Sequence, residues 1–174
     1  QIRLGDMEEL QVKGPTVMKG YWKRPDATAE VFTEDGWFRT GDQADLSDAG
    51  RIRIKGRIKE IIVTSTGEKI PPTDMELAIQ TDPLFEQVMV VGEARPFITA
   101  LAVVNEAEWE KFAKEFNVDP SDDRMLMRRD IRMAALKRLK KAASRFPQYG
   151  IPRNIRLLKE HWTVDNGCLT VTMK

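Results

Sequence analysis

Cysteine and histidine are nearly absent from this sequence, and their scarcity excludes several kinds of site. The one cysteine, Cys168, cannot form an internal disulfide or a cysteine-only zinc cluster. No base stands beside it in the sequence, so nothing predicts a thiol nucleophile. The one histidine, His161, has no second His or Cys at ligand spacing, and we interpret it as structural. We therefore predict no metal site formed by the chain's own side chains.

Long apolar runs are missing as well. No run approaches the roughly 20 residues that a membrane-spanning helix requires, and the scarcity of cysteine fits a reducing compartment, which predicts a cytoplasmic location. The composition still allows a core, because 41% of the 174 residues are hydrophobic and 32% are charged. The length fits one domain, or a small domain attached to part of another. The chain opens on Gln1, without a methionine, which is typical of a segment from within a longer protein.

Charge is balanced overall but unevenly distributed. The net charge is +1, yet residues 124–159 contain twelve basic residues and one acid, Asp130, whereas the rest of the chain has sixteen basic and twenty-six acidic residues. A basic segment can face phosphates or an anionic surface. A solvated helix face is the commoner explanation, and we prefer it. Peripheral contact with an acidic membrane, or with a phosphate group of a ligand, stays open.

The hydrophobic pattern predicts an α+β fold. Residues 1–57 read as short strands and turns, with a helical stretch near residues 27–30. Further along, strands are expected at residues 61–63, 88–91, 99–104 and 155–158, and helices at residues 74–81 and 106–116. Thr73 and Glu76 match a capping box at the start of the helix at residues 74–81. A longer helix should turn one apolar stripe to the core, formed by Met127, Ile131, Ala135, Leu139, Ala142 and Phe146.

Four segments, in a fixed order, carry a resemblance to a known superfamily. They are Gly20-Tyr21-Trp22 with Pro25, Thr28 and Phe32; residues 37–42, reading Trp-Phe-Arg-Thr-Gly-Asp; residues 56–60 with 67–72; and residues 169–174, reading Leu-Thr-Val-Thr-Met-Lys. In this order they resemble the C-terminal part of AMP-forming acyl-CoA synthetases, in the adenylate-forming superfamily. The last segment is most similar to the long-chain fatty acid–CoA ligase branch, although Val171 stands where those enzymes commonly have proline.

The resemblance implies a domain organisation. Residues 1–57 would be the strand-rich end of a large adenylation domain, and residues 58–174 a small C-terminal lid domain of the adenylate-forming fold. A hinge is expected near Lys59, because a few positions at the end of an element absorb the backbone rotation when a domain moves. In the family, the loop that grips the ATP phosphates and the acyl pocket lie upstream of this part. We therefore expect the chain alone to be inactive.

The resemblance also implies a reaction in two steps. A fatty carboxylate attacks the α-phosphate of ATP and releases pyrophosphate, with Mg²⁺ sharing the phosphate charge. The thiol of CoA then attacks the acyl adenylate and releases AMP. The implied partners are the small molecules fatty acid, ATP and CoA, together with the large N-terminal domain. Nucleic acid is not expected, because no reading motif and no interleaved aromatic residues accompany the basic segment.

Two residues are predicted to bind the nucleotide. Asp42 follows Gly41, and its carboxylate can accept hydrogen bonds from both ribose hydroxyls. Arg57 follows Gly56, and its planar guanidinium suits ribose oxygens and phosphate. The alternatives are an aspartate that caps its own turn and an arginine in a surface ion pair. The resemblance favours the nucleotide role for both.

Two roles are implied for the start of the lid. The resemblance implies that Lys59 is the pivot of the hinge. Its spacing alone would instead indicate an exposed lysine at the end of a strand. Thr66, Gly67, Glu68 and Lys69 form a glycine turn, and the resemblance implies that this turn lines the channel for CoA. A β-turn without any partner is the alternative.

The resemblance makes Lys174 catalytic. Negative charge develops between the attacked α-phosphate and the leaving pyrophosphate, and a lysine ammonium placed there stabilises the transition state. A frayed terminal lysine is the alternative. Two rival functions stay open for the chain as a whole: an adenylating enzyme for a medium-chain, aryl or amino acid, and a non-catalytic interaction module.

Overall fold

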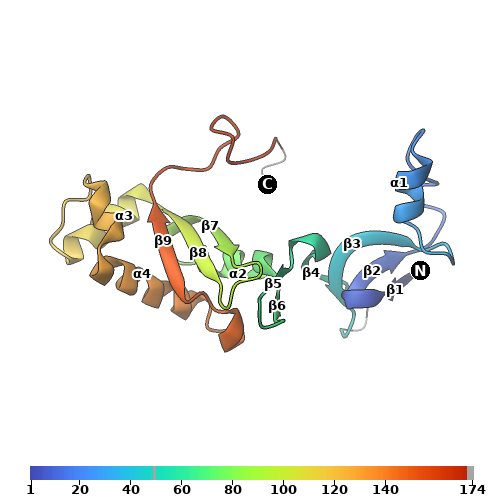
Figure 1. Ribbon diagram of the computed structural model, residues 1–174, viewed down its shortest axis with the longest axis horizontal. Helices are drawn as coiled ribbons and strands as arrows, with labels where there is room; N and C mark the ends of the chain where they lie inside the picture. Colours follow the sequence, from blue (N-terminus) through green and yellow to red (C-terminus); the bar gives the residue numbers. More distant parts are fainter. Residues whose placement is uncertain (49, 172–174) are drawn as a thin grey trace. The chain divides into compact units, whose positions relative to one another are not determined.

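The computed structural model describes residues 1–48 and 50–171 (Figure 1). The chain divides into two compact units, Gln1–Ile61 and Ile62–Lys174. The division falls just after Lys59, where a hinge is expected from the sequence. The functional roles given to the two units stay predictions.

The first unit is built on an antiparallel sheet. Its strands lie in the order β1 (Ile2–Leu4), β2 (Glu9–Val12), β3 (Phe38–Asp45) and β4 (Arg53–Arg57). The 3-10 segments are η1 (Asp6–Glu8), before β2, and η2 (Ile58–Glu60), after β4. The short helix α1 (Pro25–Glu30) begins with proline, whose missing N–H is harmless in the first turn. The prediction of short strands with a helix near residues 27–30 is confirmed.

A bulge interrupts the pairing of β2 with β3. Gln11 pairs with Arg39 and Glu9 pairs with Gln43, so β3 advances four residues where β2 advances two. Gly41 lies inside this bulge with a φ of 74°, a left-handed conformation that glycine adopts without steric cost. Asp42 follows directly and lies opposite Arg57 of β4. Bulges redirect neighbouring side chains, and this one sets the direction of the Asp42 carboxylate.

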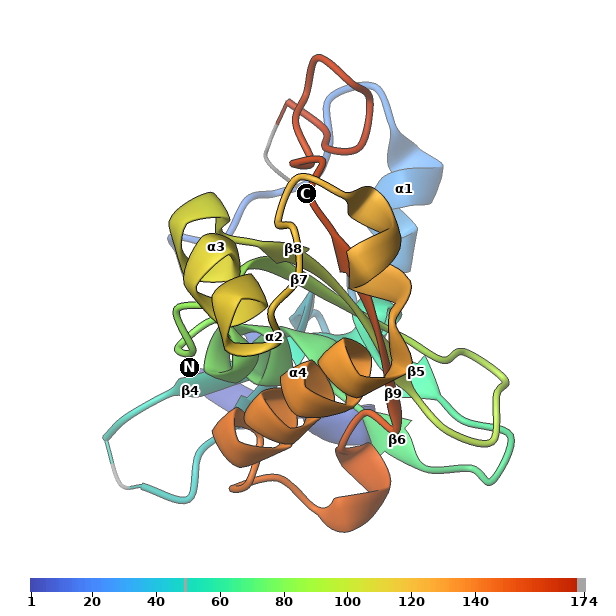
Figure 2. The same ribbon diagram turned by 90° about the vertical axis from the view of Figure 1, so that its left-hand side faces the viewer.

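The second unit packs helices on a mixed sheet. Strands β7 (Phe85–Val91) and β8 (Thr99–Val104) are antiparallel, and β9 (Asn154–Leu158) lies parallel to β8. A parallel neighbour requires a crossover, which is formed here by α3 (Glu106–Glu115), η3 (Asp123–Met127), α4 (Arg129–Ala142) and η4 (Gln148–Gly150). Helices α2 (Pro72–Ile79) and α4 lie across the same face of this sheet (Figure 2). Strands β5 (Ile62–Val63) and β6 (Lys69–Ile70) form a separate antiparallel hairpin.

The apolar stripe predicted for the long helix is confirmed in its middle and wrong at its ends. Ile131, Ala135 and Leu139 of α4 are fully buried in the core of the second unit. Met127 instead ends η3, before α4 begins, and is 44% exposed. Phe146 lies beyond the last residue of α4, although it still packs against the core. Apolar residues continue at helical spacing beyond both ends of α4. Periodicity alone therefore overestimates the length of the helix.

The capping box predicted for α2 is wrong. The helix begins at Pro72, so Thr73 is already helical, and no side chain caps the first turn. Proline is well suited to the first helical position, and here it moves the start of the helix by two residues. The Glu76 carboxylate accepts a hydrogen bond from the Val90 amide at 2.7 Å and ties α2 to β7. The helices and strands predicted elsewhere in residues 58–158 are present, with ends shifted by a few residues at most.

Candidate functional site

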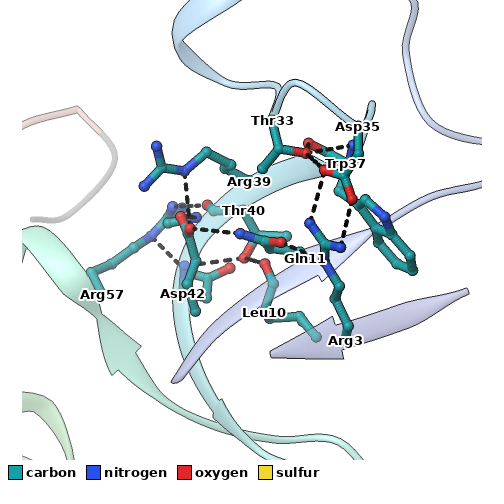
Figure 3. Close-up of polar contacts among 12 residues, drawn as sticks. Arg3, Leu10, Gln11, Thr33, Asp35, Trp37, Arg39, Thr40, Asp42 and Arg57 are labelled. Carbon is teal, nitrogen blue, oxygen red and sulfur yellow. Dashed lines mark hydrogen bonds and ion pairs between the residues drawn. The ribbon is translucent and has the colours of Figure 1, made fainter. Parts of the chain in front are cut away.

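Asp42 and Arg57 are brought together by the pairing of β3 with β4. They lie directly opposite one another in the ladder, and Arg57 Nε contacts Asp42 Oδ1 at 3.0 Å (Figure 3). Arg57 also donates from its guanidinium to the carbonyl oxygen of Thr40 at 3.1 Å. The side chains are 50% exposed for Arg57 and 28% for Asp42, and an ion pair this open adds about 0–1 kcal/mol to stability. The pair therefore matters for the direction of its groups more than for folding.

The Asp42 side chain is not needed to cap its own turn. The Asp42 amide donates instead to Thr40 Oγ1 at 3.1 Å, and Thr40 Oγ1 donates to the carbonyl oxygen of Leu10 at 2.8 Å. Within the described residues, the Asp42 carboxylate forms an ion pair with Arg57 through Oδ1 and is 28% exposed. A partly exposed carboxylate of this kind can accept hydrogen bonds from hydroxyl groups of a ligand.

A buried carboxylate lies close to this pair, and no sequence motif reveals it. Glu9 of β2 is 4% exposed. It accepts hydrogen bonds from Arg39 Nε at 3.0 Å and from the Gly41 amide at 3.2 Å. Its contact with Gly41 exists because of the bulge, which a period-two strand pattern does not reveal. In the sequence, the only sign of this contact is an acidic residue, Glu9, at the start of a short strand.

The turn at residues 66–69 connects β5 to β6 in the second unit. The Gly67 amide donates to the Thr64 carbonyl at 2.9 Å, and Gly67 has a φ of 83°. The buried Thr64 hydroxyl accepts from the Glu68 amide at 3.1 Å and contacts the Thr66 hydroxyl at 2.8 Å. Thr66, Gly67 and Lys69 are exposed, whereas Glu68 is half-buried. The turn is thus an ordered, glycine-dependent projection with its own internal hydrogen bonds.

A neighbouring loop supports this turn from outside the hairpin. The Ser65 amide donates to the Arg95 carbonyl at 3.0 Å, and the Ala94 amide donates to the Val63 carbonyl at 2.8 Å. The Glu93 carboxylate accepts from the Val63 amide at 2.9 Å. These contacts hold the hairpin against the connection between β7 and β8.

The remaining predicted residues have simpler surroundings. Lys59 lies in η2 and is exposed. His161 pairs with Glu86 at 3.2 Å, and Cys168 is exposed. Lys174 lies outside the described residues.

Two further features concern metal binding and the membrane. Among the residues that the structure describes, no cluster of His, Cys, Asp or Glu could hold a metal ion. The same part of the chain contains no helix that combines the length and the apolar character needed to cross a membrane.

Comparisons with known proteins place these features in a family. Residues 59–146 match the model of the AMP-binding enzyme C-terminal domain. The long-chain-fatty-acid–CoA ligase FadD15 of Mycobacterium tuberculosis is 36% identical over 99% of this chain and 29% of its own length. The long-chain-fatty-acid–[acyl-carrier-protein] ligase AEE15 of Arabidopsis thaliana is 32% identical over 95% of this chain and 22% of its own. The chain therefore spans less than a third of these relatives.

A solved structure agrees with the fold. The A domain of carboxylic acid reductase from Segniliparus rugosus, in complex with AMP and a carboxylic acid, superposes with a TM-score of 0.77. It is 29% identical, and the match covers 95% of this chain and 25% of that one. The predicted α+β fold, with a small C-terminal domain of the adenylate-forming type, is confirmed. The chain belongs to the AMP-binding enzyme C-terminal domain family, and its relatives include long-chain fatty acid–CoA ligases.

Proposed function

We propose that this chain is the C-terminal part of an AMP-forming long-chain fatty acid–CoA ligase. One observation carries the proposal: the likeness to FadD15 extends over 99% of the chain, through both units. The reaction joins a fatty carboxylate to ATP, forming acyl-AMP and pyrophosphate, and then transfers the acyl group to the thiol of CoA, releasing AMP.

Asp42 and Arg57 bind the ribose in this proposal. The Asp42 carboxylate accepts from the sugar hydroxyls, while the ion pair of its Oδ1 with Arg57 helps to orient it. Arg57 keeps further N–H groups for a ribose or phosphate oxygen, because its guanidinium has five donors. Both groups are charged and already oriented, so little reorganisation opposes binding.

The two halves of the reaction use different parts of the second unit. Lys174 stabilises the charge that develops on the α-phosphate and pyrophosphate during adenylation. The turn formed by Thr66, Gly67, Glu68 and Lys69 lines the path of CoA for thioester formation. Rotation about Lys59 removes Lys174 from the reacting groups and brings the turn to them, as moving lids do in other multistep enzymes. The upstream part of the enzyme supplies the phosphate loop and the acyl pocket.

Mg²⁺ is not assigned to this chain. The described residues offer no cluster of His, Cys, Asp or Glu that could hold the ion.

Lys174→Ala in the full-length enzyme tests the proposal. Losing one transition-state donor costs about 3–4 kcal/mol, so pyrophosphate release in a single turnover should slow by about 10²–10³-fold. Thioester formation from preformed acyl-AMP should stay close to the wild-type rate. Lys140→Ala, which removes an exposed lysine of α4, is the control and should change neither rate. An equal loss in both half-reactions would contradict the role of Lys174.

A second thiol acceptor is supported by one comparison. AEE15 is named as a ligase that charges acyl-carrier protein, and its likeness covers 95% of this chain. Supplying the wild-type enzyme with CoA or with acyl-carrier protein, each at the same concentration of long-chain acyl-AMP, distinguishes the two. We expect the faster transfer to CoA, because FadD15 is the more similar relative.

A further inference from the structure

We propose that Glu9 is a positioning residue for ribose recognition, acting on Asp42 through the bulge of β3. The proposal rests on the nucleotide role proposed for Asp42 and extends it to a residue that touches no substrate. Glu9 lies two strands away from Arg57, and its carboxylate is 4% exposed. A carboxylate removed from water is unfavourable unless it is hydrogen-bonded, so its partners explain why it is there.

Both oxygens of the Glu9 carboxylate are engaged. Oε1 accepts from the Gly41 amide at 3.2 Å. Oε2 accepts from Arg39 Nε at 3.0 Å and from the Gln11 side-chain amide at 3.4 Å. Gly41 and Arg39 stand one and three residues before Asp42, so Glu9 holds the backbone that leads into the nucleotide site.

The bulge is the reason that this support is needed. Between Gln11 and Glu9 the regular pairing of β2 with β3 is interrupted, and residues 40–42 have no Cα partner on β2. Gly41 adopts a left-handed conformation there. Its amide donates to the Glu9 carboxylate, and the next amide, that of Asp42, donates to Thr40 Oγ1. Side-chain oxygens thus accept from two successive amides at the point where the pairing of β2 with β3 is interrupted.

Glu9 is itself held in place. Gln11 is 5% exposed, and its Oε1 accepts from Arg3 Nε at 2.8 Å, which leaves the amide nitrogen to face Glu9. Arg3 also donates two bonds to the Asp35 carboxylate (Figure 3). A Cβ at Gly5 would overlap the Gln11 side-chain nitrogen, so a larger residue there would displace the Gln11 amide. A buried, fully bonded group of this kind orients a binding residue more firmly than a loop does.

The consequence is a specific loss when the carboxylate is removed. Without Glu9, the Gly41 amide and Arg39 lose their acceptor, and residues 40–42 can relax away from the sugar. A displacement of about 1 Å at a positioned group can cost up to about 100-fold, so we expect KM for ATP to rise by about 10- to 100-fold in Glu9→Ala. The kcat at saturating ATP should change much less, because Glu9 touches no reacting atom.

The test uses the full-length enzyme with ATP and with 2′-deoxy-ATP and 3′-deoxy-ATP. The deoxy analogues lack a hydroxyl that Asp42 is proposed to bind, so the wild type should discriminate against them. Glu9→Ala should raise KM for ATP far more than KM for these analogues, and the discrimination should shrink. A merely structural role would alter KM for all three nucleotides alike.

Two further variants keep the outcome clear. Glu9→Gln retains an oxygen for the Gly41 amide but presents an amide to Arg39, so its discrimination should lie between wild type and Glu9→Ala. Glu8→Ala removes the neighbouring carboxylate, which accepts at the surface from Lys55 and from the Gln43 side-chain amide but makes no contact with Gly41, and should leave discrimination unchanged. Glu9→Ala and Glu9→Gln that fold and discriminate like the wild type would overturn the inference. A wild-type enzyme that forms no acyl-AMP would instead overturn the proposed function.

Discussion

At the scale of single residues, the charges of the first unit act mainly by holding neighbours in position. Asp35 shows this most clearly. Arg3 donates to its two oxygens at 2.7 and 3.0 Å, and the Thr33 hydroxyl donates at 2.7 Å. Arg3 also lies over the ring of Trp37, 4.5 Å from its centroid. Bonds from Arg3 and Thr33 favour the charged carboxylate and lower the pKa of Asp35 from 3.8 to about 2.

This lowered pKa predicts how stability depends on pH. Since the pKa is lower in the folded state than in the unfolded chain, the stabilisation is complete above 3.8 and is lost as the pH falls through about 2. The difference in free energy of unfolding between wild type and Asp35→Asn should therefore be constant above that window and shrink within it. Urea unfolding at a series of pH values measures the difference. An NMR titration of the Asp35 carboxyl carbon with a midpoint near 3.8 would contradict the assignment.

The residues of the proposed nucleotide site differ in how far the sequence reveals them. Asp42 and Arg57 each stand in a recognisable motif, so they were predicted, and the ladder then placed them 3.0 Å apart. Glu9 could not be found in this way, because its contact with Gly41 depends on a bulge between strands separated by more than twenty residues. Local pattern predicts which residues occur in strands, but not the register that brings them together.

At the scale of elements, the ends of helices were harder to predict than their existence. The pattern of Thr73 and Glu76 favours a capping box, but Pro72 competes for the same turn and fixes the first helical residue. Helix α3 has a cap that the sequence pattern does not predict, formed by Asn105. Its Oδ1 accepts from the Glu108 amide at 3.2 Å and caps the helix. Competition between neighbouring start signals thus decides where a helix begins.

This contrast can be measured by substitution. Removing the cap in Asn105→Ala should lower the free energy of unfolding by about 1 kcal/mol, whereas Asn105→Ser should restore most of it, because serine also caps well. Thr73→Ala should change it by less than about 0.5 kcal/mol, since Thr73 caps nothing. Urea denaturation with an unchanged slope gives the values. A loss in Thr73→Ala as large as that in Asn105→Ala would mean that Thr73 does stabilise α2.

At the scale of the whole molecule, the likeness to other proteins joins two units that fold around separate interiors. The match to FadD15 and the superposition on the reductase domain each cover at least 95% of the chain, across the division after Ile61. From the sequence, a boundary after residue 57 follows only from the resemblance to the family. The sequence does not reveal the interior of the first unit, where the polar Glu9 and Gln11 are buried as well as the apolar Leu10 and Ala44.

The proposed pivot at Lys59 predicts that backbone freedom matters there and the side chain does not. Lys59→Pro fixes φ, and a backbone conformation that proline adopts only under strain costs about 1–3 kcal/mol. The half-reaction that needs the rotated arrangement should therefore slow by about 10- to 100-fold. The other half-reaction should stay near the wild-type rate, as should both in Lys59→Ala. Single-turnover pyrophosphate release and thioester formation from acyl-AMP separate the two steps. If Lys59→Pro slowed both steps equally, a hinge at this position would be excluded. If Lys59→Ala slowed the reaction as much as Lys59→Pro does, the ammonium group itself would take part.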